Sequence, residues 1–168
     1  DEKEFKVKAY QITQWGKMLE ENEVPIPKPT GTEVLIKIRA SGICHSDIHI
    51  WDGYFDLGSG KRITLEEETV ITFTLGHEPV GEVVALGPEA TGVGIGDRRI
   101  VYPWIGCGVC KVCKNGEELL CNDPITVGTR RDGGYAEYLL APHAKYLVSY
   151  DGVDEAFAAT AACSGITV

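Results

Sequence analysis

The sequence predicts a mainly β fold, an antiparallel barrel or sandwich with a few short helices. Three observations lead to this prediction. Segments in which apolar and polar residues alternate with a period of two recur through most of the chain, as in half-buried strands. Glycine, proline and aspartate separate these segments and mark turns. Patterns with the 3.6-residue period of a helix are scarce.

The first expected strand covers residues 33–39. Val34, Ile36 and Ile38 fall on one face, whereas the charged residues of the segment fall on the other face together with Leu35. Before this strand, residues 25–29 carry a proline at every second position and are expected to form an extended connector. Further strands are expected at residues 80–86, 99–102, 135–141 and 145–148.

Three short helices are expected, directly after Cys44, at residues 117–120 and at residues 154–162. The last of these opens with acidic residues and continues through alanines, which is typical of a helix N-terminus. The segment 92–97 reads GVGIGD and is similar to the start of a dinucleotide-binding fingerprint. Its glycines fall at every second position and a strand-like segment follows, so we expect a turn there.

Composition places the chain among ordinary globular proteins and predicts a single domain over residues 1–168. Hydrophobic residues make up 43% of the sequence and charged residues 24%. The net charge of −9 disfavours nucleic acid or an anionic membrane as a partner. No apolar segment approaches the ~20 residues of a membrane span. Cysteines that serve as metal ligands favour the reducing cytoplasm.

Four cysteines lie close together with the spacing C-x2-C-x2-C-x7-C. They are Cys107, Cys110, Cys113 and Cys121. Four thiolates in so short a segment can surround one zinc ion as a tetrahedron, with no position left for a substrate. Lys111 and Lys114 lie between these ligands and would offset the excess negative charge. The sequence therefore predicts a structural zinc site in a lobe at about residues 103–123.

Cysteines can also form disulfides or hold an iron–sulfur cluster. Disulfides are disfavoured because a chain of this length can form a core without such cross-links. An iron–sulfur cluster is the stronger alternative, since ferredoxins begin with the same C-x2-C-x2-C run and end with x3-C-P. Here seven residues precede the fourth cysteine and Asn122 follows it. Zinc is favoured, and an iron–sulfur electron carrier remains an alternative function.

Two further cysteines, Cys44 and Cys163, lie outside this cluster. Together with His77 they would make a Cys2His set, and three protein ligands with one open position are typical of catalytic zinc. Each signal is weak alone, because single cysteines and histidines are common in protein cores. Beside a four-cysteine zinc motif, however, the combination indicates a second metal site.

Three separate motifs resemble the GroES-like catalytic domain of the zinc-dependent medium-chain alcohol dehydrogenases. The family signature G-H-E-x2-G-x5-[GA]-x2-[IVSAC] is matched by Gly76, His77, Glu78, Gly81, Gly87 and Ala90. The four-cysteine lobe has the spacing of the family. The segment C-H-S-D-x-H at residues 44–49 is similar to the family's first zinc ligand and proton relay. The resemblance implies a distorted antiparallel GroES-like barrel.

The resemblance also implies roles for single residues. Cys44, His77 and Cys163 would bind the catalytic zinc. Ser46 would contact the substrate oxygen and begin a proton relay, which passes through the cofactor ribose in this family. His49 would end that relay near solvent, and its ordinary pKa near neutrality suits this task.

Other implied roles concern the surroundings of the zinc and the cofactor. Asp47 would hold His77 from behind, and Glu78 would lie behind the zinc and replace a ligand during exchange. His45 would contact the cofactor pyrophosphate, and Thr167 would lie near the nicotinamide. Three aromatic residues fall near family positions that line the substrate pocket, or alternatively belong to the core: Trp51, Phe55 and Trp104.

The implied function is that of an alcohol dehydrogenase catalytic domain. Such a domain oxidises a small alcohol to an aldehyde or ketone by hydride transfer to NAD or NADP, with one catalytic and one structural zinc per chain. Full-length members are homo-oligomers and continue into a Rossmann domain, which we expect to be absent from this chain. We therefore expect these 168 residues alone to bind zinc without turnover. The alternative is a non-catalytic module that retains only the structural zinc.

The segment between the first two ligands is longer than the family's compact members lead us to expect. Thirty-two residues separate Cys44 from His77, including a loop at residues 58–70 that is rich in glycine and glutamate. Such a loop would shape the entrance for substrate or contact another subunit. An acidic insertion without function is an equally good interpretation.

Overall fold

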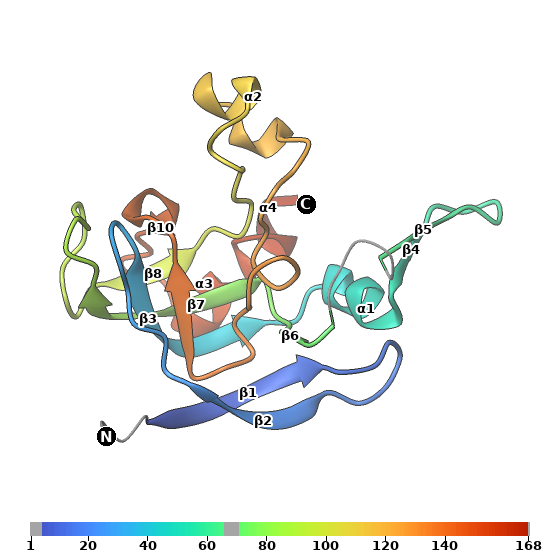
Figure 1. The fold of residues 1–168 in the computed structure, drawn as a ribbon, viewed down its shortest axis with the longest axis horizontal. Coiled ribbons are helices and arrows are strands. Elements are labelled where there is room, and N and C mark those ends of the chain that lie inside the picture. The colour runs from blue at the N-terminus through green and yellow to red at the C-terminus, as the bar shows by residue number, and fades with distance from the viewer. Residues whose placement is uncertain (1–4, 66–70, 168) are drawn as a thin grey trace.

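The computed structural model describes residues 5–65 and 71–167, and its architecture is mainly β (Figure 1). A five-stranded antiparallel sheet has the order β10-β8-β7-β3-β9, and a three-stranded sheet has the order β2-β1-β6. Strands β4 and β5 form a separate hairpin. The predicted fold, mainly antiparallel β with a few short helices, is confirmed.

The elements follow one another in alternating groups of strands and short helices. The strands are β1 Lys6–Ile12, β2 Glu20–Pro25, β3 Val34–Gly42, β4 Tyr54–Asp56, β5 Arg62–Thr64, β6 Phe73–Thr74, β7 Glu78–Leu86, β8 Arg98–Val101, β9 Tyr138–Ala141 and β10 Leu147–Val148. The helices are α1 His45–Asp52, α2 Lys111–Lys114, α3 Glu155–Thr160 and α4 Ser164–Thr167, with 3-10 turns η1 Glu118–Leu120 and η2 Ala144–Tyr146. No helix among the described residues has the length and apolar character to cross a bilayer.

Strands β3 and β7 form the long central pair that positions the functional residues. Their antiparallel register runs from Val34 opposite Leu86 to Gly42 opposite Glu78, with two irregularities that bend the pair. The end of β3 therefore lies beside the start of β7. Cys44 follows β3 by two residues and His77 directly precedes β7, so the pairing brings both to one place.

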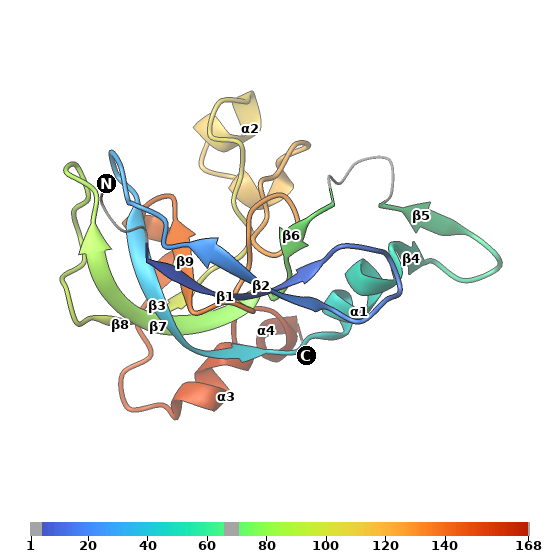
Figure 2. The same ribbon diagram turned by 60° about the horizontal axis from the view of Figure 1, so that its bottom comes forward.

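The apolar core is divided among three clusters of buried side chains. The largest lies on the five-stranded sheet and includes Val34, Ile36 and Val83. A second cluster joins Val80 to the alanines of α3, which packs against β3 and β7 (Figure 2). The third connects β1, β6 and α1. Helix α3, which precedes Cys163 in the chain, is thereby fixed on the same central strands.

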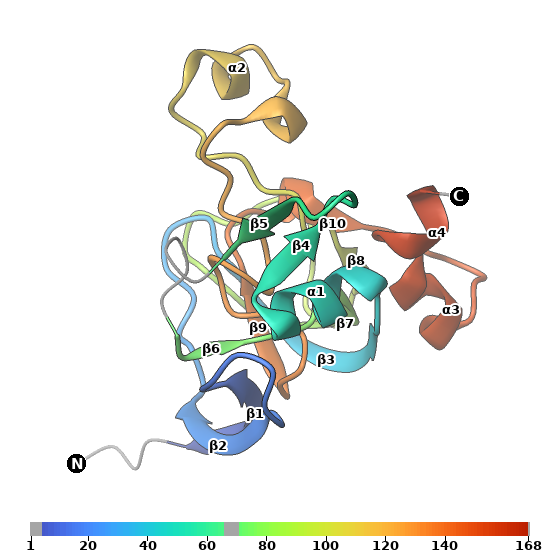
Figure 3. The same ribbon diagram turned by 90° about the vertical axis from the view of Figure 1, so that its right-hand side faces the viewer.

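The four-cysteine segment forms a lobe that projects from the sheets and carries α2 and η1 (Figures 1 and 3). Cys110 is the N-cap of α2, and its sulfur accepts a hydrogen bond from the backbone N–H of Cys113 at 3.4 Å. Glu118 connects the lobe to the rest of the domain. Its carboxylate accepts hydrogen bonds from Lys145 Nζ and Tyr146 Oη, each at 2.5 Å.

Most element predictions are confirmed, and the differences have local causes. The expected strand at residues 145–148 is wrong at its start, because η2 precedes the two-residue β10. The His143 side chain accepts a hydrogen bond from the Lys145 N–H at 2.9 Å and so caps this turn. The expected strand at 135–141 is regular only over β9, while Ala136 makes an isolated bridge to Ala9. The turn at 92–97 is confirmed.

The segment 58–70 is only partly a loop. Strand β5 lies within it and pairs with β4, with Phe55 opposite Ile63, so the residues up to 64 complete a hairpin. Arg62 stacks over the ring of Tyr54 at 4.1 Å from its centroid. Residues 66–70 of the predicted loop lie outside the described part of the chain.

Candidate metal centres

The four cysteines of the lobe bring their sulfur atoms together. All four sulfurs lie within 4.8 Å of one another, and all four are free thiols. Cys107 Sγ is 3.9 Å from Cys113 Sγ, and Cys110 Sγ is 3.9 Å from Cys121 Sγ. A tetrahedron with Zn–S distances of about 2.3 Å has edges of about 3.8 Å, so these separations fit a single zinc ion.

Backbone N–H groups surround these sulfurs but do not stabilise all four as thiolates. Hydrogen bonds from the backbone of Val109 and Cys110 lower the pKa of Cys107 to about 7. Burial, in contrast, raises the pKa of Cys113 to about 12. The lobe thus requires a cation before all four cysteines can be ionised together near neutral pH.

This difference in pKa predicts the order of alkylation in the metal-free chain. At pH 7, iodoacetamide is expected to modify Cys107 well before Cys113, because about half of the Cys107 thiols are ionised at a pH equal to their pKa. Peptide mass spectrometry of samples quenched at intervals measures both rates. In the zinc-loaded chain both cysteines should be protected. Equal rates for the two cysteines without metal would contradict the prediction.

The second predicted ligand set is also assembled. Donor atoms of Cys44, His77 and Cys163 lie within 4.8 Å of one another, and the two sulfurs are 3.8 Å apart. All three residues are buried. They come from three elements, namely the start of α1, the residue before β7 and the junction between α3 and α4. The structure therefore brings together residues that lie up to 119 positions apart.

The imidazole of His77 is oriented by a buried carboxylate. Asp47 Oδ1 lies 2.8 Å from His77 Nδ1, and Asp47 is only 1% exposed. Nε2 of His77 has no hydrogen-bond partner among the described residues. Because Nδ1 is engaged by Asp47, Nε2 is the nitrogen available to a metal. An unpaired buried nitrogen beside two cysteines fits a site made for a soft cation.

The titration of the three donors depends on their different surroundings. Burial acts to raise the pKa of Cys44, but the backbone and hydroxyl of Ser46, together with the contacts to Cys163 and His77, outweigh it and lower the pKa. Burial raises the pKa of Cys163 to about 12. Burial also opposes protonation of His77, yet the hydrogen bond and charge of Asp47 raise its pKa. The metal-free set is therefore a mixture of charged and neutral donors.

Helix α1 presents several of the predicted site residues. Cys44 is its N-cap, and Asp47 in the first turn accepts the Cys44 N–H at 3.0 Å, which is one half of a capping box. The ring of His49 lies 4.7 Å from that of His45 and 5.2 Å from that of Phe55. Phe55 and His49 are half-buried and His45 is exposed, so this aromatic row of three rings ends at the surface.

The C-terminal part of the site is held by Glu78. This residue is fully buried, and its Oε1 accepts the Ser164 N–H at 2.6 Å. Its Oε2 has no partner within the described ranges. The Thr167 hydroxyl donates to the backbone oxygen of Cys163 at 2.7 Å. Glu78 thus anchors the segment that carries the third candidate ligand.

The three aromatic candidates separate into two groups. Trp104 lies beside the site, with its ring 6.2 Å from that of His77, and Phe55 lies beside His49. Trp51 and Phe55 both pack against the cluster of β1, β6 and α1, but Trp51 donates its indole N–H to the Lys17 backbone oxygen. Trp51 is thus a half-buried residue at the edge of this cluster.

One neighbour of the site, Tyr135, is not predicted by any pattern in the sequence. Its hydroxyl contacts Asp47 Oδ2 at 3.3 Å, although the two residues are 88 positions apart. Burial and the charge of Asp47 raise the pKa of Tyr135, so its hydroxyl keeps its proton at neutral pH. No motif marks this tyrosine, and only the folded chain reveals the contact.

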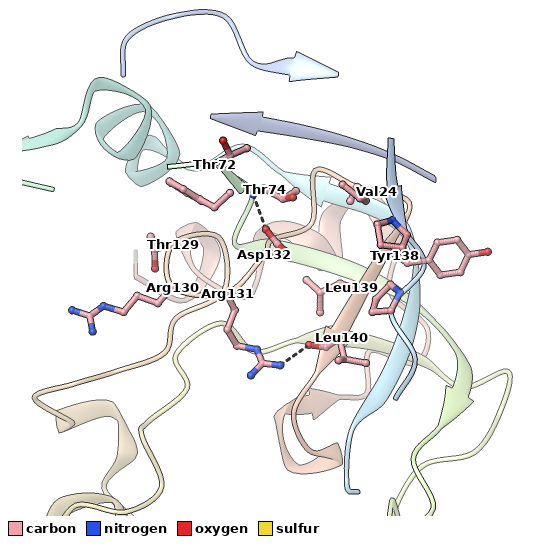
Figure 4. A pocket seen from close by; sticks show the side chains of 14 residues that line it. Val24, Thr72, Thr74, Thr129, Arg130, Arg131, Asp132, Tyr138, Leu139 and Leu140 are labelled. Atoms are coloured by element: carbon pink, nitrogen blue, oxygen red, sulfur yellow. Dashed lines mark hydrogen bonds between the residues drawn. The ribbon is translucent and has the colours of Figure 1, made fainter. Parts of the chain in front are cut away.

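A cavity of about 830 Å³ lies elsewhere in the domain (Figure 4). Its walls come from the end of β2, from β6 and β9, and from residues 129–132. Asp132 Oδ1 accepts the Thr74 N–H at 2.8 Å, and Arg131 Nη2 donates to the Leu140 backbone oxygen at 3.5 Å (Figure 4). None of the seven candidate metal ligands lines this cavity.

Comparison with known proteins gives consistent matches. Residues 30–151 match the family model of the alcohol dehydrogenase GroES-like domain. An NAD-dependent alcohol dehydrogenase of Sulfurisphaera tokodaii is 43% identical over 161 residues, which cover 96% of this chain and 46% of that protein. The chain thus spans about half the length of the curated relatives it matches.

Solved structures with the same architecture include two archaeal enzymes. The D-arabinose dehydrogenase from Sulfolobus solfataricus superposes with a TM-score of 0.79 at 31% identity, over 97% of this chain and 46% of that one. A cobalt- and zinc-bound thermostable alcohol dehydrogenase from Pyrobaculum aerophilum has a TM-score of 0.76 at 28% identity. That match covers 94% of this chain and 45% of the other.

Proposed function

The chain belongs to the family of alcohol dehydrogenase GroES-like domains, and we propose that it is the catalytic domain of a zinc-dependent alcohol dehydrogenase. The reaction would be oxidation of an alcohol to an aldehyde or ketone, or its reverse, with NAD or NADP as hydride carrier. The main support is the unpaired Nε2 of buried His77, which lies beside Cys44 and Cys163 while Asp47 holds Nδ1.

We propose two zinc ions per chain with different tasks. Cys107, Cys110, Cys113 and Cys121 would fill all four positions of a structural zinc. Cys44, His77 and Cys163 would hold the second zinc and leave one position open. When bound there, zinc supplies a Lewis acid that polarises the substrate oxygen and lowers the pKa of an alcohol.

The residues around this open position would bind the substrate and move its proton. Ser46 lies against Cys44, so its hydroxyl is placed to receive a proton from an alcohol bound beside that cysteine. His49 would release the proton to solvent, which its half-buried place in the aromatic row favours. Phe55 and Trp104 would form apolar walls that exclude water.

Other proposed roles concern the cofactor and the exchange of zinc ligands. We assign His45 to the cofactor pyrophosphate, because its exposed imidazole lies at the N-terminus of α1. Thr167 would lie near the nicotinamide. Glu78 would act from behind the metal, since its Oε2 is buried and has no partner among the described residues. A carboxylate in that position can replace a ligand during exchange.

We also propose the organisation of the larger protein. Residues 1–168 would form the catalytic domain, with the structural-zinc lobe at about 103–123 and the dinucleotide-binding Rossmann domain outside this chain. Every pair of named strands in the described part is antiparallel, unlike a Rossmann sheet. The isolated 168 residues would then bind metal without turnover. The complete enzyme would be a cytoplasmic homo-oligomer that acts on small molecules.

Metal analysis of the purified chain tests the proposal. Elemental analysis with native mass spectrometry should find two zinc ions per chain, and Cys163→Ala should retain one, because only the open set loses a ligand. Cys110→Ala is the matched control and should lose the other zinc. One zinc in the unmodified chain, lost only through Cys110→Ala, would indicate a non-catalytic module. A brown chain that contains iron would indicate an electron carrier.

The open position itself can be tested with cobalt in place of zinc. Imidazole added to the chain with two cobalt ions should shift the visible spectrum, because it can occupy the vacant position of the Cys2His set. In Cys163→Ala, whose remaining cobalt would lie in the closed four-cysteine site, imidazole should have no effect. An unchanged spectrum in the unmodified chain would contradict a substrate position on the metal.

A further inference from the structure

Tyr135 contacts Asp47, the carboxylate that orients His77 in the Cys2His set. Its hydroxyl lies 3.3 Å from Asp47 Oδ2 and 3.3 Å from the backbone oxygen of Gly42. The single hydroxyl proton is shared between these two acceptors, which belong to the end of β3 and to α1. Tyr135 therefore joins a central strand to the helix that begins at Cys44.

The Asp47 carboxylate receives three donors and almost no solvent. Oδ1 meets His77 Nδ1 at 2.8 Å, whereas Oδ2 accepts the Cys44 N–H at 3.0 Å and the Tyr135 hydroxyl at 3.3 Å. Because the two oxygens move together when the carboxylate rotates, the donors on Oδ2 also determine where Oδ1 points. The direction of Oδ1 in turn sets the orientation of the His77 ring.

The ring and backbone of Tyr135 hold the other side of the same site. A Cβ atom on Gly76, the residue before His77, would lie only 2.5 Å from the Tyr135 ring, so the ring packs directly on that backbone. The Tyr135 N–H donates to the Leu75 backbone oxygen at 2.9 Å. One residue thus contacts both the segment that carries His77 and the carboxylate that orients it.

We propose that Tyr135 is a positioning residue of the Cys44–His77–Cys163 centre. Its hydroxyl fixes the plane of the Asp47 carboxylate, and through it the direction in which His77 presents Nε2 to the metal. The residue acts on the metal through Asp47 and His77 and makes no contact with the substrate. This inference rests on the proposed function, because it requires that the Cys2His set binds a metal.

Tyr135→Phe tests the proposal because it removes only the hydroxyl and keeps the ring that packs on Gly76. Tyr10→Phe is the matched control, since its hydroxyl also donates to a carboxylate, Glu21 Oε2 at 2.7 Å, but outside the site. Each chain is loaded with Co²⁺, and chelator competition measures the affinity of each site. Subtraction of the spectrum of Cys163→Ala, measured under the same conditions, isolates the Cys2His cobalt.

The expected result is a loss of Co²⁺ affinity at the Cys2His set alone. Tyr135→Phe should lower the Co²⁺ affinity of the Cys2His set by about threefold to tenfold. This decrease is smaller than the one expected when Asp47, the direct partner of His77, is replaced. The cobalt absorption of Tyr135→Phe should also change in position or intensity, because the ligand orientation changes. The four-cysteine site should keep its affinity, and Tyr10→Phe should match the unmodified chain at both sites.

Three results would overturn the inference, and each would do so for a different reason. If Tyr135→Phe and Tyr10→Phe bind Co²⁺ with equal affinity and equal spectra at the Cys2His set, the hydroxyl has no positioning role. If Tyr135→Phe weakens both sites equally and lowers the melting temperature, its role is general stability. If the unmodified chain binds Co²⁺ only at the four-cysteine site, the proposed function fails and this inference fails with it.

Discussion

Replacing Asp47 with alanine is expected to weaken metal binding by Cys44, His77 and Cys163 about 10- to 100-fold. The substitution leaves His77 Nδ1 without its partner, so the imidazole no longer has a fixed orientation or tautomer. It also leaves the Cys44 N–H and the Tyr135 hydroxyl without their shared acceptor. Because His77 and Cys44 are buried, the free energy of unfolding should fall by about 2–4 kcal/mol.

Chelator competition and urea unfolding measure the two effects of Asp47→Ala. The four-cysteine site provides an internal control, since its ligands lie in the separate lobe. Asp52→Ala, at the other end of α1, should leave the affinity of both sites unchanged. Asp47→Asn preserves the shape of the side chain and one acceptor oxygen. Its metal affinity at the Cys2His set should therefore lie between those of Asp47→Ala and Asp52→Ala. Equal affinity in Asp47→Ala and Asp52→Ala would exclude an orienting role for Asp47.

Gly81→Ala is expected to have the largest effect on stability. Gly81 lies in the middle of β7, opposite Ile38 of β3. An added Cβ would lie 2.3 Å from the Lys37 backbone oxygen and 2.6 Å from Ile36 Cγ2. The backbone oxygen cannot move without separating the two central strands. The free energy of unfolding should therefore fall by about 3 kcal/mol or more, which corresponds to a melting temperature lower by roughly 6–12 °C.

Thermal and urea unfolding of the metal-loaded chain test this prediction. Gly94→Ala is the matched control, because its added Cβ would meet only Asp97 Oδ1 at 4.0 Å and its backbone needs no left-handed conformation. The free energy of unfolding of that variant should stay within about 0.5 kcal/mol of the unmodified value. If Gly81→Ala and Gly94→Ala have the same free energy of unfolding, the close approach of β3 and β7 does not explain why glycine occupies position 81.

The central strands were predictable because their side chains follow simple rules. Residues 33–39 place three apolar residues on one face, and residues 80–86 are a mostly apolar segment; the structure places β3 and β7 there. The sequence does not predict the β4–β5 hairpin, because Gly58 and Gly60 in its turn are equally typical of a long loop. The sequence does not predict helix α2 either, for a different reason. It is a single turn begun by the Cys110 sulfur, and residue periodicity cannot detect so short an element.

The candidate site was predictable only where its residues are local. The spacing of the lobe cysteines alone indicated a shared metal, and their sulfurs do converge. For the distant pair Cys44 and Cys163, no spacing rule applies, so their shared site is inferred only from the residue types left over beside a zinc motif and from the family resemblance. Tyr135 had neither kind of signal, because its contact with Asp47 depends on how β3, α1 and the segment before β9 pack together.

The two ligand sets differ in how much chain must be synthesised before each can close. Cys107 and Cys121 are 14 positions apart, whereas Cys44 and Cys163 are 119 positions apart and require the β3–β7 pairing as well. The entropy lost on closing a loop grows with its length, and chains emerge from the ribosome N-terminus first. A nascent chain therefore completes the lobe first, while the Cys2His set is still without Cys163. The lobe is thus the first competitor for scarce metal in the cell.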